Sequence, residues 1–459
     1  MIRRFLVVKN KSGLDTSEIN TQNARFVVKL PAMKNIGKYE IVKELGRGAT
    51  STVYLAIDSF NNQQVALKLF KLDTAHDSSI AKVFRKLLVT EAALAGKLSH
   101  PHIVKVYDAV IDDEVNYMVM EYIDGETLER SSEVDHLLPL GRAAEIIYKC
   151  CKALEYAQSQ GVIHRDIKPA NILLSGESEI KISDFGAAVI ESQQETQVSG
   201  LGSPAYMSPE QIEERPLTHQ TDIYSLGVTM YRLLTGRLPF DAANNYSMIY
   251  QIMNIDPPPP STFRPEIQPA LDAIVLRAMC KDTKNRYQNW DEFARDLVAF
   301  ISDSVEPQAK IYDTEKFDTL RTLPFFKNFS DVELWEVLRI SVWNKIPQDE
   351  QIITEGDDGR DFYILARGTV KVIKHGRLLS LLHTGDCFGE MAHLSEKNAK
   401  RSTDVITKTE VTLIALDPEV LAKSSSGCRY QFSEAFLHML AKRLAVSNIR
   451  ISHLLSDHQ

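Results

Sequence analysis

Two hydrophobic periodicities divide the first 300 residues of the chain. From about residue 38, apolar side chains alternate with polar ones, as in the series Val53, Leu55 and Ile57. A period of two is typical of strands with one buried face. From about residue 140 to 300 the apolar residues follow a helical spacing instead. Strands followed by helices predict an α+β unit of two lobes.

The pattern changes after a polar stretch, which we interpret as a linker. Short β-rich segments with recurring glycines follow it, and this spacing predicts a small barrel or jelly roll. We therefore expect a multidomain protein with an N-terminal arm of unknown role (1–37), a first domain (38–301), a linker (302–316) and a second domain (317–459).

The tail of the chain has one long helical pattern. Phe432, Phe436 and Leu440 recur every four residues, and Leu444 continues the stripe. Such a stripe predicts an amphipathic helix that packs on one face. It suits a lid over the second domain, and it also suits packing against a second copy in a homodimer.

Composition restricts the class of protein. Of the 459 residues, 44% are apolar and 25% are charged, and the formal net charge is −8. The acidic balance disfavours a nucleic-acid partner. No apolar run reaches the length of a membrane span, and the five cysteines have no CxxC spacing. We therefore expect a cytoplasmic protein with reduced cysteines.

A glycine-rich turn is the first candidate for chemistry. The stretch LGRGATSTV places Gly46 and Gly48 between two predicted strands. Glycines there let backbone amides approach phosphate oxygens, because no Cβ stands in the way. The next strand carries Ala66 and Lys68 on one face, in the sequence VALK. Glycines between strands are often only turns, so the motifs that follow decide the interpretation.

Acidic and amide side chains come next. HRDIKPAN contains Asp166, Lys168 and Asn171, and DFG contributes Asp184. Carboxylate and amide oxygens are hard ligands suited to Mg²⁺. Phosphoryl transfer needs charge neutralisation and in-line positioning more than covalent help. Two oxygen ligands and two lysines supply both.

Taken in order, these motifs resemble the eukaryotic-type Ser/Thr protein kinases over about residues 39–300, and their sequences are most similar to bacterial members. The resemblance implies a bilobal protein kinase fold, ATP as co-substrate, Mg²⁺ or Mn²⁺ as cofactor and a protein substrate. It implies that Lys68 binds the α- and β-phosphates and that Glu91 orients Lys68. It also implies that Asp166 acts on the substrate hydroxyl, that Lys168 binds the γ-phosphate, and that Asn171 and Asp184 bind the metal.

The resemblance also implies supporting positions. Asp222 matches the aspartate that braces the catalytic loop, and Arg286 matches the arginine that pairs with Glu210. Ser51 replaces the third glycine of the loop, which leaves a pseudokinase that only binds nucleotide as an alternative. The expected adenine site consists of Val53, Ala66, Met120 and Leu173, with the backbone of Glu121 to Ile123 as hinge.

A polar segment lies between Asp184 and Glu210. The resemblance makes it an activation loop, in which Thr196 and Ser199 are candidate autophosphorylation sites. A phosphorylated hydroxyl there could pair with Arg165 and order the segment. The alternative is a solvated loop without regulatory chemistry.

The second domain holds another constellation, in the stretch FGEMAHLSEKNAKRS. Gly389 and Glu390 offer backbone N–H groups to an anion and a carboxylate to a sugar hydroxyl. Arg401 can bind two phosphate oxygens, and Ser402 can add a hydroxyl donor. A carboxylate beside an arginine suits a cyclic nucleotide better than free phosphate.

This portion resembles the cyclic-nucleotide-binding domain family, over about residues 320–459. The resemblance implies a β jelly roll with a C-terminal lid helix and cyclic AMP or cyclic GMP as effector. The spacing from Glu390 to Arg401 is slightly long, and Lys400 replaces the usual proline. Three alternatives follow: a kinase regulated by cyclic nucleotide, a constitutive kinase whose barrel serves docking or dimerisation, and a DNA-binding module. The acidic charge and the lack of room after the tail helix disfavour the DNA-binding module.

Overall fold

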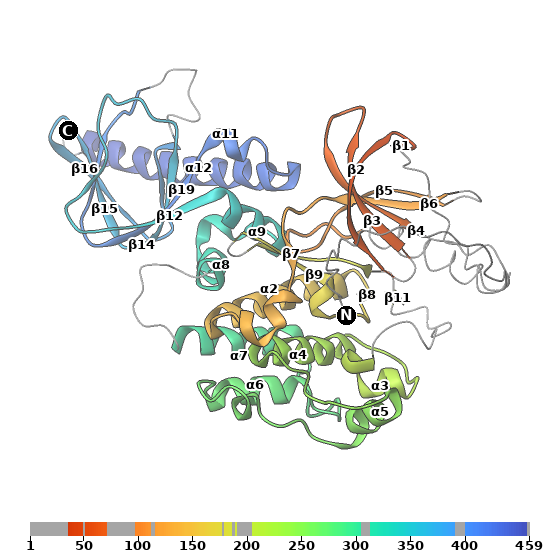
Figure 1. The fold of residues 1–459 in the computed structure, drawn as a ribbon. Helices are drawn as coiled ribbons and strands as arrows, with labels where there is room; N and C mark the ends of the chain where they lie inside the picture. Colours follow the sequence, from red (N-terminus) through yellow and green to blue (C-terminus); the bar gives the residue numbers. More distant parts are fainter. Residues whose placement is uncertain are drawn as a thin grey trace, which may run out of the picture.

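The computed structural model describes residues 35–48, 51–70, 97–111, 115–176, 179–185, 189–190, 204–303, 313–390 and 400–456. In Figure 1, a β-sheet lobe lies above a helical lobe, and a β-rich domain lies beside them with helices α8 and α9 in between. The two-lobed α+β unit and the following β-rich domain confirm the fold class expected from the sequence.

The first lobe is a six-stranded sheet with the order β1-β2-β3-β4-β6-β5. Each neighbouring pair is antiparallel, and its own small core contains Val65, Leu67 and Val119. The strands are β1 (Asn35–Ile36), β2 (Tyr39–Arg47), β3 (Ser51–Asp58), β4 (Gln64–Phe70), β5 (Val106–Ile111) and β6 (Asn116–Glu121).

The second lobe consists mainly of helices. Their predicted spacing is confirmed most clearly by α2 and α4; α4 ends at Gly236, whose φ of 72° suits a residue without Cβ. The α-helices are α2 (Leu140–Ser159), α3 (Pro209–Ile212), α4 (Gln220–Thr235), α5 (Asn245–Asn254), α6 (Pro269–Ala278) and α7 (Trp290–Asp303). The short 3₁₀ helices are η1 (Arg130–Ser132), η2 (Val134–His136), η3 (Pro169–Asn171), η5 (Pro204–Tyr206) and η6 (Pro260–Thr262).

Short strands connect the helical lobe to the site. Strands β10, β9 and β7 form one small sheet in that order, and β11 pairs with β8. They are β7 (Glu126–Thr127), β8 (Val162–Ile163), β9 (Ile172–Ser175), β10 (Glu179–Ile182) and β11 (Val189–Ile190). The hairpin β9–β10 places residues 171 and 184 next to each other at one end.

The C-terminal domain begins with helices α8 (Asp313–Thr322), η7 (Pro324–Phe326) and α9 (Asp331–Ile340). Two four-stranded sheets follow, with orders β12-β19-β14-β17 and β13-β18-β15-β16. Their strands are β12 (Ser341–Ile346), β13 (Gln351–Ile353), β14 (Phe362–Arg367), β15 (Thr369–Lys374), β16 (Arg377–His383), β17 (Cys387–Phe388), β18 (Asp404–Thr407) and β19 (Val411–Leu416). This matches the expected jelly roll.

The predicted linker is shorter at both ends than the sequence suggested. Helix α7 continues to Asp303, and helix α8 already begins at Asp313. Residues 304–312 lie outside the described part of the chain. Only the first four residues of α8 lie within 302–316, and Thr314 is the single buried residue among them, so the polar composition of that range did not reveal the helix.

The tail helix follows the short helix α11 (Pro418–Leu421) and is confirmed as α12 (Ser426–Ser456). Phe432 and Phe436 are buried, whereas Leu444 is 63% exposed, so the part of the stripe that packs within this chain does not reach Leu444. The phenylalanines of η7 and Phe362 pack against the first half of the helix. The stripe therefore ends where these aromatic partners end. No helix in the described residues is long and apolar enough to cross a membrane.

Candidate functional site

A buried carboxylate fixes the loop after β8. Asp222, in the first turn of α4, accepts hydrogen bonds from the backbone N–H groups of His164 (2.7 Å) and Arg165 (2.8 Å). Burial raises the pKa of Asp222, although both backbone hydrogen bonds oppose the rise. Arg165 has a φ of 68°, and these bonds stabilise that unfavourable backbone conformation. The bracing role expected for Asp222 is confirmed.

Two polar side chains of this loop converge on the carboxylate of a third residue, Asp166. Lys168 Nζ lies 2.7 Å from Asp166 Oδ2, and Asn171 Nδ2 donates to the same oxygen (3.0 Å) and to the Asp166 carbonyl (2.8 Å). Asp166 is thus held by two donors at one oxygen while part of its side chain stays accessible. Such a carboxylate can accept a hydrogen bond from an approaching hydroxyl.

An ion pair joins the two lobes. Lys68 Nζ, on β4 of the first lobe, contacts Asp184 Oδ1, which follows β10 of the second. Burial opposes ionisation of Asp184, but the Lys68 ammonium outweighs it and lowers the pKa of the carboxyl group. Asp184 therefore stays ionised at neutral pH, with a φ of 67°. Lys68 is 9% exposed, so this cation lies inside the cleft.

Asn171 and Asp184 suit a hard divalent cation. The Asn171 amide nitrogen donates to Asp166, which leaves its amide oxygen as the atom able to bind a metal. Ser183 donates its backbone N–H (2.9 Å) and its hydroxyl (3.2 Å) to the Asn171 carbonyl, so the two candidate ligands are tied together. In the described residues no cluster of three His, Cys, Asp or Glu side chains forms a metal cage. Two protein oxygens are the number expected where phosphates and water complete a Mg²⁺ shell.

The other residues expected at the nucleotide lie on strands of both lobes. Strand pairing sets Val53 opposite Lys68, and Ala66 opposite Met120. Leu173 lies on β9 and is half-buried. Of the two glycines expected to approach phosphate, Gly46 lies near the end of β2, and Gly48 donates its N–H to the Ser51 carbonyl (2.8 Å). Of the expected hinge, Glu121 ends β6 and Ile123 lies just beyond it.

A buried ion pair anchors the chain after the predicted activation loop. Arg286 donates to Glu210 at both carboxylate oxygens, at 2.7 and 3.2 Å, which confirms the expected pairing. Thr221 adds a hydroxyl donor to Glu210 at 3.0 Å. Three further residues predicted from the sequence lie outside the described residues: Glu91, Thr196 and Ser199.

The C-terminal domain brings the second candidate set together. Arg401 donates to the carbonyls of Gly389 (3.1 Å) and Asp361 (2.8 Å). Gly389 has a φ of +81°, and a Cβ there would lie 2.9 Å from Arg401 Nη1, so this position needs glycine. Glu390 is 3% exposed and Arg401 is 8% exposed, whereas Ser402 is exposed. A buried arginine held by carbonyls keeps further N–H groups for an anion.

Sequence reasoning missed one residue at this site. Arg443, on the tail helix, donates to Glu390 Oε1 at 2.6 Å and also to the Cys387 carbonyl. The tail helix therefore contacts the carboxylate expected to bind a sugar hydroxyl. No motif marks this arginine, because its partner lies more than fifty positions earlier in the chain.

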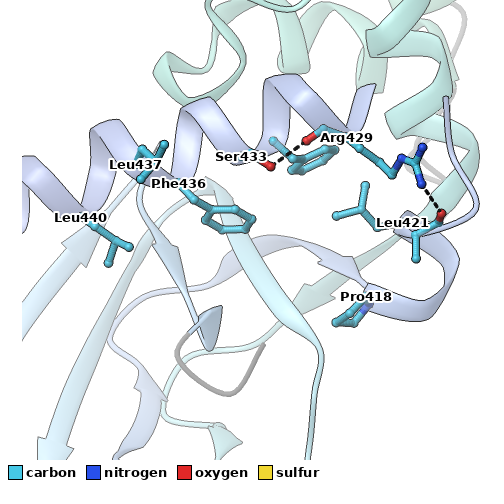
Figure 2. A pocket seen from close by; sticks show the side chains of 9 residues that line it. Pro418, Leu421, Arg429, Ser433, Phe436, Leu437 and Leu440 are labelled. Carbon is cyan, nitrogen blue, oxygen red and sulfur yellow. Dashed lines mark hydrogen bonds between the residues drawn. The ribbon is translucent and has the colours of Figure 1, made fainter. Parts of the chain in front are cut away.

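An apolar hollow of about 420 Å³ lies between α11 and α12 (Figure 2). Leu421, Phe436, Leu437 and Leu440 line it, and Arg429 closes one end by donating to the Ala422 carbonyl at 3.1 Å. Neither Glu390 nor Arg401 belongs to its lining. The hollow is therefore separate from the predicted cyclic-nucleotide residues Glu390 and Arg401.

Comparisons with known proteins identify two families in the chain. Residues 39–298 match the model described as protein kinase domain, and residues 343–424 match the cyclic nucleotide-binding domain. The chain is 40% identical over 268 residues to serine/threonine-protein kinase PknB of Mycobacterium leprae, covering 57% of this chain and 42% of that protein. It is 34% identical over 296 residues to serine/threonine-protein kinase PrkC of Bacillus subtilis, covering 64% and 45%. The chain spans less than half the length of these curated relatives.

Proposed function

The chain belongs to the protein kinase family, and from that premise we propose that it transfers the γ-phosphoryl group of ATP to serine or threonine hydroxyls of a protein. The observation that carries the proposal is the convergence of Asp166, Lys168 and Asn171 in one lobe with the Lys68–Asp184 ion pair that joins both lobes. These are the charges and donors that phosphoryl transfer requires.

The residues divide the work of the transfer between them. The substrate hydroxyl oxygen forms a bond to the γ-phosphorus while the bond to the β–γ bridging oxygen breaks, and the hydroxyl proton passes to Asp166. Lys168, next to Asp166, neutralises the γ-phosphate, and Lys68 does the same for the α- and β-phosphates. Asn171 and Asp184 would hold Mg²⁺, which supplies charge neutralisation at the phosphates.

Radiolabelled ATP tests this activity directly. The full chain is incubated with MgCl₂, γ-labelled ATP and a generic basic protein, and the labelled protein is hydrolysed to identify phosphoamino acids. We expect label on serine or threonine. ATP binding without any transferred label would favour the pseudokinase alternative instead.

We further propose that cyclic AMP or cyclic GMP binds the C-terminal domain and regulates this activity. Glu390 and Arg401 support the proposal. Both side chains are buried, and Arg401 donates to the carbonyl of Gly389, the residue next to Glu390. A coupling of about 1–3 kcal/mol would give roughly 5- to 150-fold control. Phosphorylation rates across a titration of each nucleotide test it; a barrel that serves docking or dimerisation predicts rates that neither nucleotide changes.

Replacing Arg401 should weaken cyclic-nucleotide binding. We expect Arg401→Lys to raise the Kd roughly 30- to 100-fold, since an ammonium cannot make the paired contacts of a guanidinium and the phosphate loses a buried partner. Calorimetric titration of the full chain measures this, with a thermal melt to verify folding. Arg377→Lys, at an exposed arginine of β16, is the matched control. Equal affinity of both variants would contradict the assignment.

Removing the candidate phosphorylation sites tests autoregulation. We propose that Thr196 or Ser199 is autophosphorylated, so that the double change to alanine lowers peptide phosphorylation several-fold by removing charge that can pair with Arg165. Ser192→Ala, in the same segment, is the control. Unchanged rates in the double variant would refute this part of the proposal.

A further inference from the structure

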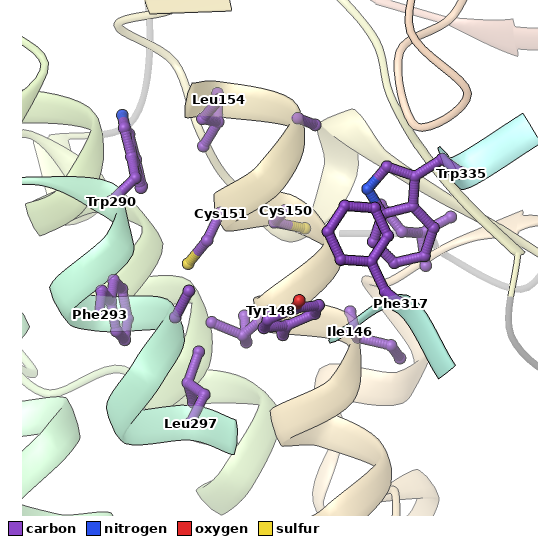
Figure 3. Close-up of a cluster of buried hydrophobic side chains, with 14 of the residues drawn as sticks. Ile146, Tyr148, Cys150, Cys151, Leu154, Trp290, Phe293, Leu297, Phe317 and Trp335 are labelled. Atoms are coloured by element: carbon purple, nitrogen blue, oxygen red, sulfur yellow. The ribbon is translucent and has the colours of Figure 1, made fainter. Parts of the chain in front are cut away.

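Helices α8 and α9 of the C-terminal domain pack against the helical lobe (Figures 1 and 3). Trp335 of α9 stacks on Phe317 of α8, with ring centroids 4.5 Å apart. The indole ring also contacts His102 edge-on, with ring centroids 4.6 Å apart, and Tyr148 of α2, with ring centroids 6.3 Å apart. Trp335 is 1% exposed, so the two domains share a continuous core at this residue.

Charged groups surround the aromatic contact. Lys149 of α2 lies 2.7 Å from Asp313 Oδ2 of α8, and Glu145 lies 3.4 Å from the same ammonium. Burial opposes ionisation of Asp313, but Lys149 outweighs it and lowers the pKa of that carboxyl group. Arg339 of α9 also pairs with Glu179 at the start of β10, at 3.5 Å. Complementary charges therefore fix the position of α8 and α9 on the helical lobe.

His102 connects this contact to the strand that leads into the cleft. Its Nδ1 donates to the Ile180 carbonyl at 3.1 Å, because a carbonyl can only accept. Its own carbonyl accepts the Ile182 N–H at 2.9 Å. Ile182 ends β10, two residues before Asp184. A displacement of His102 would thus move the backbone that carries Asp184.

The contact also contains polar atoms that the described structure leaves without partners. Burial lowers the pKa of His102 well below its usual range, so the ring is neutral and its Nε2 can only accept. Trp335 Nε1 is a donor, and both atoms are buried without a hydrogen bond, as is the Tyr148 hydroxyl. An unpaired donor and acceptor on touching rings favour a second arrangement in which they pair. A second packing, with the indole turned so that its N–H meets His102 Nε2, would satisfy both atoms.

The residues proposed to bind cyclic nucleotide are connected to helix α9 through α12. Arg443 links Glu390 to α12, and Phe436 of α12 packs against Phe325 of η7 with ring centroids 5.5 Å apart. Helix α9 follows η7 directly and packs against α12. A ligand that displaces Arg443 from Glu390 would change the position of α12 and, with it, the packing of α12 against α9.

We propose that Trp335 is a positioning residue for Asp184, which it holds through His102 and β10, and that rotation of α9 between two packings of this contact is how the C-terminal domain controls the phosphate site. This inference rests on the proposed kinase function. A ligand can bias the contact only to the extent that it binds one packing better than the other.

Calorimetric ATP binding to the full chain tests the inference without needing turnover. We expect Trp335→Ala to weaken ATP binding about 5- to 10-fold in MgCl₂ and to leave binding in EDTA unchanged, because only the metal-dependent part requires Asp184. Trp335→Phe keeps the stacking and should restore the affinity to within about twofold. Trp343→Ala removes a tryptophan of the same domain that bonds to Ser341 rather than to the kinase lobe, and it should change neither value.

The outcomes separate this inference from the proposed function. Wild-type affinity in a folded Trp335→Ala chain overturns it, and so does an equal loss in MgCl₂ and EDTA, which would indicate general damage to the fold. If Trp335→Ala does not fold, Trp335→Leu keeps an apolar side chain there and is judged by the same two values. A wild-type chain that transfers no phosphate would refute the proposed activity, while the binding comparison would still decide the role of Trp335.

Discussion

Asp166→Asn is expected to lower kcat about 10²- to 10⁴-fold and to leave the KM for ATP within about threefold of wild type. Asp166 accepts hydrogen bonds from Lys168 and Asn171, so its carboxylate is fixed in place before any substrate binds. An amide has nearly the same shape, but it cannot take the proton of the hydroxyl. The loss should therefore fall on the chemical step and not on nucleotide binding.

Steady-state kinetics with varied ATP measure this effect. Asp135→Asn is a matched control, because Asp135 is an exposed aspartate of η2, outside the site. It should retain wild-type kcat and KM. A residual kcat above about one tenth of wild type for Asp166→Asn would contradict a role for Asp166 in the transfer step.

The sequence predicted the parts of the site that lie close together in the chain or carry a motif. Asp166, Lys168 and Asn171 fall within one loop, so their convergence follows from local geometry. The long-range pairs of Asp222 with the loop backbone and of Arg286 with Glu210 were also expected, but only through the resemblance to kinases. Nothing in composition or periodicity indicates which arginine reaches a given carboxylate.

Contacts between the domains could not be predicted in this way. His102 and Trp335 are far apart in the sequence, yet their ring centroids lie 4.6 Å apart. Arg443 carries no motif, yet it pairs with Glu390. Such contacts depend on how two folded units pack, and hydrophobic periodicity describes each element separately. For the same reason the stripe of α12 was extended to Leu444, where no partner was foreseeable.

Arg286→Leu is expected to reduce the free energy of unfolding at neutral pH by about 3–5 kcal/mol, because it leaves the buried Glu210 carboxylate without its cation. Arg286 is 1% exposed and Glu210 is 5% exposed. The guanidinium also donates to the Cys280 and Gln220 carbonyls, at 2.9 and 2.7 Å, and these lose a donor as well. Urea denaturation followed by circular dichroism measures the change. Arg130→Leu breaks the exposed Arg130–Glu126 pair and should cost at most about 1 kcal/mol.

The pH dependence of this difference distinguishes a lost ion pair from lost packing. In the wild type, burial opposes ionisation of Glu210, but Arg286 outweighs it and lowers the pKa of the carboxyl group. The stability from this pair is therefore fully present above the pKa of an unfolded glutamate, about 4.3, and is lost as the pH falls through the lower folded value. In Arg286→Leu the pKa of Glu210 should instead be raised by burial. Lowering the pH should therefore protonate the unpaired carboxylate and remove its cost to the variant, while the wild type loses the stability of its ion pair. The gap between the two should narrow from pH 7 toward about pH 4; a gap that stays constant would mean that packing, and not charge, makes Arg286 important.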